Sequence, residues 1–184
     1  MNRSLFWRNA ANWGFLLGLA VFLWALVVWG LRWEPANGWL AEGLLALILM
    51  AAIWITGRKN ASLTGDAGYS YGEAVGFVFA LMLFAGIVSG VGQFVIYTYI
   101  APEYYADLIG DMFDRAVAEG NDIVNQTGLD KMKSLMISFT HNPFVMIFSG
   151  VFDLAVKGGF LGLIFGAFLK RLPEAPRTEI HGDE

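Results

Sequence analysis

The chain has 184 residues, a length typical of one domain. Hydrophobic residues make up 57% of it and charged residues only 15%, whereas a soluble domain is about 45–50% apolar and about 25% charged. This composition excludes a water-soluble globule. The lack of cysteine excludes disulfide frameworks and cysteine zinc sites. A net charge of −4 without a basic cluster argues against nucleic acid as a partner.

The first half of the chain holds two apolar stretches that can cross a membrane. A hydrocarbon core about 30 Å thick needs about 20 apolar residues in a helix. Residues 13–31 carry no charge, and residues 39–56 carry only Glu42, near their start. Arginines precede the first stretch as in a signal peptide. We expect the stretch to be retained, because it is too long for a signal and lacks a small-residue cleavage site.

The third apolar stretch, residues 75–100, has no charge and is long enough to cross the membrane with a tilt. Gly86, Ser89, Gly90 and Gln93 recur in it at intervals of three and four residues, so they share one helix face. This face predicts a seam of small and polar side chains that contacts another helix.

Residues 103–139 predict two amphipathic helices on the outer membrane face. Apolar residues recur in this segment at helical spacing, while acidic residues fall on other faces. The segment could cap the mouth of the bundle, or its acidic row could bind a cation or a partner. That row lacks the ligand spacing of a calcium loop. The row is formed by Asp107, Asp111 and Asp114.

The fourth apolar stretch, residues 144–169, contains Asp153 and Lys157. One such charge at the centre of a membrane helix costs about 2.5–3.5 kcal/mol. The two residues are four positions apart, so they can pair on one face, which should point into protein. Three roles stay open for this pair: a structural ion pair, a proton or ion relay, and a contact to a lipid or substrate headgroup.

The depths of these polar residues predict how the third and fourth spans pack. Counted from the outer end, Ser89 and Gln93 lie at depths that match Lys157 and Asp153 within about 3 Å. We therefore expect the two spans to pack antiparallel. In that arrangement Gln93 faces Asp153, and Ser89 lies near Lys157.

A stripe of glycines on the fourth span predicts a second close contact. The stripe points about 150° away from the charged pair and permits close helix approach. We therefore expect the fourth span to be contacted on both sides, at the centre of its bundle or against a second copy. Gly14 and Gly18 of the first span could meet the stripe. The stripe is formed by Gly158, Gly162 and Gly166.

Orientation follows from the basic residues outside the spans. Seven Lys and Arg residues lie on the side of the termini and four on the other side. Both termini, including the polar tail at residues 170–184, are therefore predicted to be cytoplasmic. The sequence contains no nucleophile elbow, phosphate loop or metal-binding motif. We accordingly expect no enzymatic activity, no metal and no cofactor.

Four short motifs resemble those of a known family. They are Phe6-Trp7-Arg8-Asn9-Ala10-Ala11-Asn12-Trp13-Gly14, Tyr69-Ser70-Tyr71-Gly72-Glu73-Ala74, Tyr97-Thr98-Tyr99-Ile100-Ala101-Pro102, and the glycine-rich last span. The chain resembles the small bacterial inner-membrane family called domain of unknown function forty-one ninety-nine. The resemblance implies four helices with an outer amphipathic segment before the last, and it brings no activity or catalytic residues.

The predicted fold is an all-α integral membrane protein. One membrane domain, residues 1–184, forms a bundle of four transmembrane helices with an extracytoplasmic amphipathic helical segment between the third and fourth. Two functions are compatible with it. The first is a non-catalytic accessory or scaffold subunit of a bacterial envelope complex, in the lipid bilayer beside a second copy or a membrane partner such as a glycosyltransferase. The alternative is a small transporter or ion-coupled protein that uses Asp153 and Lys157.

Overall fold

A computed structural model describes residues 3–32, 38–64, 68–118 and 126–170, and this part of the chain is helical without strands. Four of its helices are long and apolar enough to cross a membrane, which confirms the predicted multi-pass helical architecture. The polar tail at residues 171–184 lies outside the described residues. The elements in chain order are α1 (Arg3–Gly30), α2 (Gly38–Ser62), α3 (Tyr71–Val95), η3 (Ile96–Ile100), α4 (Pro102–Ala118), α5 (Gln126–Thr140) and α6 (Pro143–Leu169).

Helices α1 and α2 extend furthest beyond the predicted apolar stretches. Helix α1 begins at Arg3 rather than at residue 13. Its first turns pack on α3, because Ala10 is buried and the Phe6 ring meets Phe77 edge-on at 5.9 Å. Helix α2 continues to Ser62. Tertiary contacts of these polar ends, rather than hydropathy, therefore set the helix boundaries.

Local capping fixes where α3 and α6 begin. The Ser70 hydroxyl accepts a hydrogen bond from Glu73 N at 3.3 Å, and Ser70 N donates to Glu73 Oε2 at 3.0 Å. These reciprocal bonds form a capping box, which satisfies backbone donors at the helix start. At α6, Asn142 Oδ1 accepts from Phe144 N at 3.0 Å, and Pro143 occupies the first helical turn, where its missing N–H has no cost.

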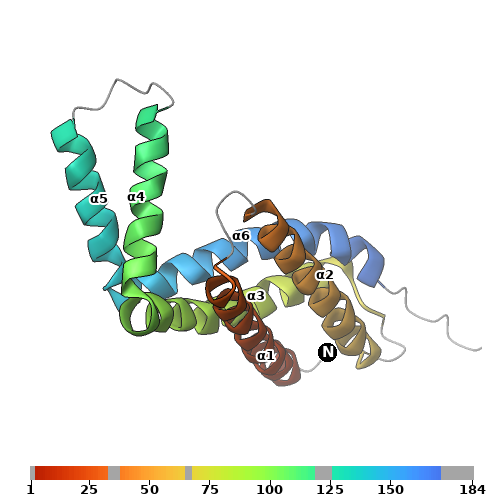
Figure 1. Ribbon diagram of the computed structural model, residues 1–184. Helices are drawn as coiled ribbons and strands as arrows, with labels where there is room; N and C mark the ends of the chain where they lie inside the picture. The colour runs from red at the N-terminus through yellow and green to blue at the C-terminus, as the bar shows by residue number, and fades with distance from the viewer. Residues whose placement is uncertain (1–2, 33–37, 65–67, 119–125, 171–184) are drawn as a thin grey trace, which may run out of the picture.

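Helix α3 is the central helix of the bundle, and α1 and α6 pack on it (Figure 1). Phe77, Leu81 and Met82 of α3 are fully buried. The glycines of α1 rest on this helix too, since a Cβ at Gly14 or Gly18 would clash with the α3 backbone. The predicted contact between those glycines and the glycine stripe of α6 is therefore wrong. We expected the fourth span at the centre of its bundle or against a second copy. The central helix is instead α3, because the glycine faces of α1 and of α6 both pack on it.

Helices α3 and α6 pack antiparallel with their backbones in contact. A Cβ on Gly86 would lie 2.5 Å from Val151 Cα, and a Cβ on Gly90 would lie 2.6 Å from Ile147 Cα. From the other helix, a Cβ on Gly150 would lie 2.7 Å from Gly90 Cα. Only glycine permits backbones to approach so closely. The crossing point of α3 and α6 is therefore set by these three glycines.

The glycine stripe of α6 continues the same contact towards the end of the helix. A Cβ on Gly158 would clash with Met82, and one on Gly166 would meet Val75. Between them, a Cβ on Gly162 would have ordinary contact with Val78 at 3.5 Å. The stripe thus packs on α3, with the charged pair on a different face of α6.

Helices α4 and α5 form a hairpin that turns away from α3 and α6 and runs crosswise to them (Figure 1). The two helices run side by side, and Lys133 of α5 lies over Gly110 of α4. Ile109 of α4 is buried, whereas the predicted acidic row is exposed. The first part of α4 covers the bundle, as a cap would, and the rest of the hairpin extends beyond it.

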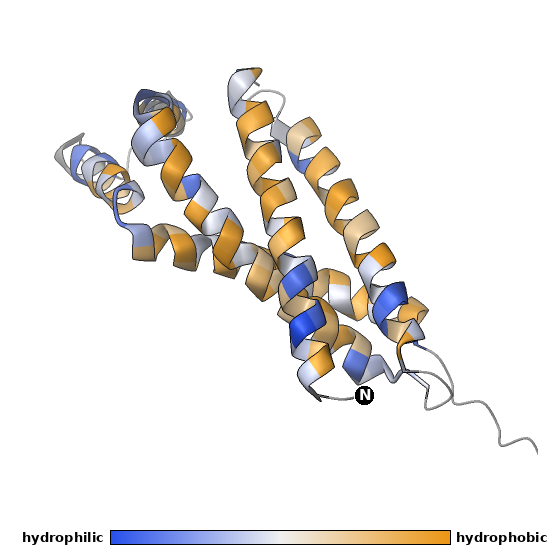
Figure 2. Ribbon diagram, turned by 90° about the horizontal axis from the view of Figure 1, so that it is seen from below, coloured by the Kyte–Doolittle hydropathy of each residue, from blue (hydrophilic) through white to orange (hydrophobic). Residues whose placement is uncertain are grey.

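The long helices are apolar over most of their length, with polar residues near the end where the chain begins (Figure 2). The hairpin end of the bundle is the end where α4 and α5 project. The opposite end is the one where α1 and α3 begin and where α2 and α6 end.

Candidate ligand chamber and ion trio

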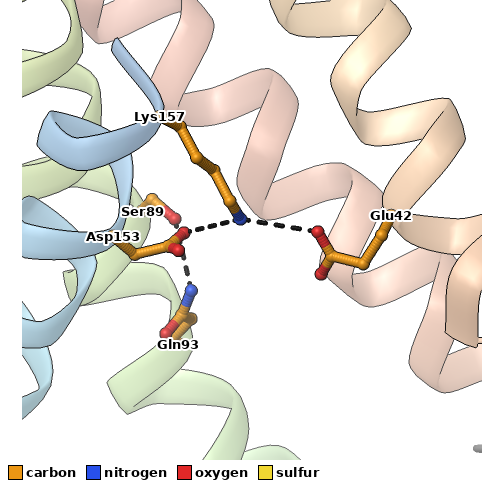
Figure 3. Close-up of polar contacts among 5 residues, drawn as sticks. All are labelled: Glu42, Ser89, Gln93, Asp153 and Lys157. Carbon is orange, nitrogen blue, oxygen red and sulfur yellow. Dashed lines mark hydrogen bonds and ion pairs between the residues drawn. The ribbon is translucent and has the colours of Figure 1, made fainter. Parts of the chain in front are cut away.

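Three charged side chains meet between α2 and α6 (Figure 3). Lys157 Nζ lies 2.9 Å from Asp153 Oδ2 and donates a hydrogen bond to it. The same nitrogen lies 3.5 Å from Glu42 Oε2. The pairing within α6 is the one that the four-residue spacing predicted. We call Glu42, Asp153 and Lys157 the ion trio.

Glu42 is the member of the ion trio that sequence reasoning missed. The prediction noted it only as a charge near the start of the second span. Its signal was that it is the only charge in residues 39–56. Glu42 supplies the second acceptor for Lys157 and links α2 to α6.

The polar seam of α3 lies beside the ion trio in a different register from the predicted one. Gln93 Nε2 donates to Ser89 Oγ at 3.5 Å, and Ser89 is buried (Figure 3). Gly86 faces Val151 and Gly90 faces Ile147. Asp153 of α6 therefore lies beside the part of α3 that comes about two turns before Gln93. The structure therefore places Ser89 closer than Gln93 to the level of Asp153. The prediction erred by measuring depth from span ends that the backbone contact does not align.

The ion trio borders a chamber of 380 Å³ near the hairpin end. Helices α1, α2, α3, α4 and α6, with η3, contribute to its walls, so the whole bundle builds it. Its volume falls within the range of about 300–1,000 Å³ that is usual for small-molecule sites. Its lining consists of Val21, Trp24, Ala25, Val28, Trp29, Gly38, Ala41, Glu42, Leu45, Gln93, Ile96, Tyr97, Tyr104, Leu108, Asp153 and Lys157.

An apolar groove of 170 Å³ adjoins the chamber between α2 and α6. Glu42, Leu45 and Lys157 line both spaces. The groove and the chamber therefore meet where Lys157 pairs with Glu42. The remaining lining of the groove is hydrophobic, and Phe160 is 68% exposed at its edge. The residues that complete the groove are Ala46, Leu49, Phe160 and Leu161.

The opposite end of the bundle is closed by a buried polar cluster. Tyr69 is fully buried, and its hydroxyl accepts from Asn60 Nδ2 at 3.1 Å and donates to the Glu73 carbonyl at 3.3 Å. Asn9 Nδ2 donates to Asn60 Oδ1 at 3.4 Å, which joins α1 to α2. Burial is the main cause that raises the pKa of Tyr69 to about 12. Packed side chains therefore fill the bundle at this end, and none of these residues lines the chamber.

The described lining of the chamber includes three charged side chains. Its described lining carries two carboxylates and one ammonium, which gives an excess of one negative charge when all three are ionised. Side-chain exposures are 68% for Glu42, 50% for Asp153 and 32% for Lys157, so all three charges are accessible from the chamber. Within residues 3–32, 38–64, 68–118 and 126–170, no cluster of three metal-ligating side chains occurs.

The fold and the site define a multi-pass helical membrane protein with a chamber that carries three charged side chains among its apolar helices. The family model described as "Protein of unknown function (DUF4199)" matches residues 12–171. The chain therefore belongs to this family, which confirms the resemblance seen in its motifs. No curated protein and no solved structure matches the chain.

Proposed function

We propose that the protein is a non-catalytic accessory or scaffold subunit of an envelope complex in the bacterial inner membrane. In this proposal both termini are cytoplasmic, and the hairpin of α4 and α5 is the extracytoplasmic element that holds an integral membrane partner. A membrane glycosyltransferase is one candidate partner, and a second copy of the chain is another. The observation that carries the proposal is an uncovered apolar stripe on α5.

The α5 stripe consists of side chains at the spacing of one helix face. They lie at intervals of three, four and seven residues, which is the pattern of a helix that buries one side. All four are exposed, with exposed fractions from 42% to 54%. Nothing in the described part of the chain covers them. The α5 stripe is Met132, Leu135, Met136 and Phe139.

The neighbouring helix uses a different face of α5. Lys133 lies over Gly110 of α4, and Lys133 and Ile137 are half-buried. The contact between α4 and α5 thus leaves the α5 stripe free for another surface. Contiguous exposed apolar side chains outside the membrane core typically mark an interaction site, and methionine suits such surfaces because its side chain adapts to the partner.

The distribution of basic side chains supports the proposed orientation. Arg8, Arg58, Lys59 and Lys170 lie at the opposite end of the bundle, away from the hairpin. Basic residues near span ends favour the cytoplasmic side. Two of them also stack on aromatic rings, with Arg58 4.1 Å from the centroid of Trp54. The hairpin then falls on the extracytoplasmic side.

Photo-crosslinking in native membranes tests this proposal. A photoreactive residue at Met136 should give one discrete crosslinked product with a second polypeptide, whereas the same residue at Ser134, exposed on another face of α5, should give little. Leu135→Glu in the α5 stripe should abolish the product, and Ser134→Glu should leave it. A product of twice the chain's mass identifies a second copy as the partner. Crosslinks to lipid alone would refute the accessory role.

A small transporter or ion-coupled protein is the second candidate. It is favoured by a charged trio that lines a chamber within apolar helices. The packed side chains around Tyr69 mean that transport requires a second conformation open to the opposite end. Ion or solute flux into liposomes, reduced by Asp153→Asn, would support this candidate. Liposomes without flux, or with flux that Asp153→Asn leaves unchanged, would eliminate it.

A further inference from the structure

We propose that the chamber binds a lipid with a phosphoethanolamine headgroup. Its ammonium would lie between Glu42 and Asp153, its phosphate would bind Lys157, and one acyl chain would occupy the groove between α2 and α6. This inference rests on the chamber and the ion trio alone. It is independent of the α5 stripe and of the accessory role.

The charge balance of the ion trio selects a ligand with a cationic group. Two carboxylates share one lysine, so one negative charge is left over where the ion trio borders the chamber. Charges at membrane depth are costly unless they are compensated. A ligand ammonium near the free carboxylate oxygens compensates them locally and replaces contacts that water would otherwise supply, and the ligand's own phosphate leaves the net charge of the site unchanged.

The hydrogen-bonding capacity of Lys157 selects an anionic group on the same ligand. An ammonium has three donors, and Lys157 directs one to Asp153 at 2.9 Å and one to Glu42 at the longer distance of 3.5 Å. The third donor meets no acceptor in the described part of the chain beyond these two carboxylates, so a phosphate oxygen can accept it. A zwitterionic headgroup therefore matches both unused capacities of the ion trio, whereas a purely cationic ligand matches one.

Aromatic side chains form part of the walls of the chamber. They are Trp24 and Trp29 of α1, Tyr97 of η3 and Tyr104 of α4. Aromatic faces attract organic ammonium groups, which is how many proteins recognise them. A volume of 380 Å³ also exceeds what a single inorganic cation fills. These walls favour an organic ammonium over a metal ion.

The groove supplies a path for the hydrophobic part of the ligand. Glu42, Leu45 and Lys157 lie at the junction of the chamber and the groove, so a headgroup bound at the ion trio points its tail between α2 and α6. The groove is apolar, and its edge residue Phe160 is exposed at the flank of the helices. In a membrane this flank faces acyl chains. A lipid can therefore enter sideways, without passing through the hairpin end.

A ligand series on the wild-type protein tests the inference without any variant. The protein in detergent is titrated with short-chain phosphatidylethanolamine, its N-acetylated form, phosphatidylglycerol and ethylamine, and bound ligand is counted by native mass spectrometry. Phosphatidylethanolamine should bind about tenfold more tightly than its N-acetylated form, since acetylation removes one charge-assisted contact. Equal binding of these two lipids, or tighter binding of phosphatidylglycerol, would refute the proposal. Binding of ethylamine as tight as that of the lipid would show a simple cation site and also refute it.

Variants then locate the site. Glu42→Gln should weaken phosphatidylethanolamine binding about tenfold, while Asp111→Asn, which removes a carboxylate from the exposed face of α4, should leave it unchanged. Leu45→Trp should fill the junction with the groove and displace the lipid. If Glu42→Gln does not fold, the N-acetylated lipid on the wild type still decides the question. Unchanged affinity in folded Glu42→Gln would place the lipid elsewhere and overturn the assignment.

Discussion

Gly90→Ala should destabilise the protein because it separates the backbones of α3 and α6. The added Cβ would lie 2.6 Å from Ile147 Cα and 2.8 Å from the Met146 carbonyl oxygen, whereas carbon atoms in contact prefer about 3.5–4.0 Å. Both neighbours are backbone atoms of a helix, so no side-chain rotation relieves the overlap. The helices must separate by about 1 Å, and overpacking of this kind costs about 1–3 kcal/mol.

The matched control is Gly76→Ala on the same helix, where an added Cβ meets nothing within 4 Å. Both substitutions gain the same intrinsic helix propensity, about 1 kcal/mol, so their difference isolates the clash. For a chain of this size the Tm of Gly90→Ala should fall below that of Gly76→Ala by roughly 2–12 °C. Thermal unfolding in one detergent measures it. Equal Tm values for the two variants would refute the backbone contact.

Two further predictions concern the polar clusters. Asp153→Asn should lower the free energy of unfolding by only about 1 kcal/mol, because Glu42 still pairs with Lys157. The double variant Asp153→Asn with Glu42→Gln should lose more free energy of unfolding than the two single variants together. Chemical denaturation measures these losses, and simple additivity would contradict the prediction. Burial raises the pKa of Tyr69 from 10.0 to about 12, so its contribution to stability is complete below pH 10 and is lost as the pH rises through 12. Tyr69→Phe should flatten the fall of Tm between pH 10 and pH 12, and an unaltered slope would contradict that reasoning.

The number and order of the helices could be predicted because apolar length is a local property. Residues 75–100 are helical in the structure as α3 and η3, and residues 144–169 lie within α6. The start of α1 could not be read in the same way, because its first ten residues are held by contacts such as Phe6 on Phe77. Hydropathy reports the membrane, whereas such ends depend on tertiary packing.

Partners across helices were harder to predict than faces within a helix. Spacing put Asp153 and Lys157 together on α6, and they pair there. It could not say that α3, rather than α1, covers the glycine stripe, since a small-residue face fits several helices. Glu42 escaped for a related reason: a charge near a helix start has an ordinary explanation in the membrane surface.

The contact between α3 and α6 also constrains the order in which the protein is made. Helix α3 can pack on α1 as soon as residue 95 is synthesised, but its glycines at Gly86 and Gly90 have no partner until Gly150 and Ile147 follow. During that interval the whole α4–α5 segment is synthesised. The central helix is thus incomplete until the last span arrives. A ribosome that stops before α6 leaves a nascent chain in which the glycine face of α3 has no helix to pack on.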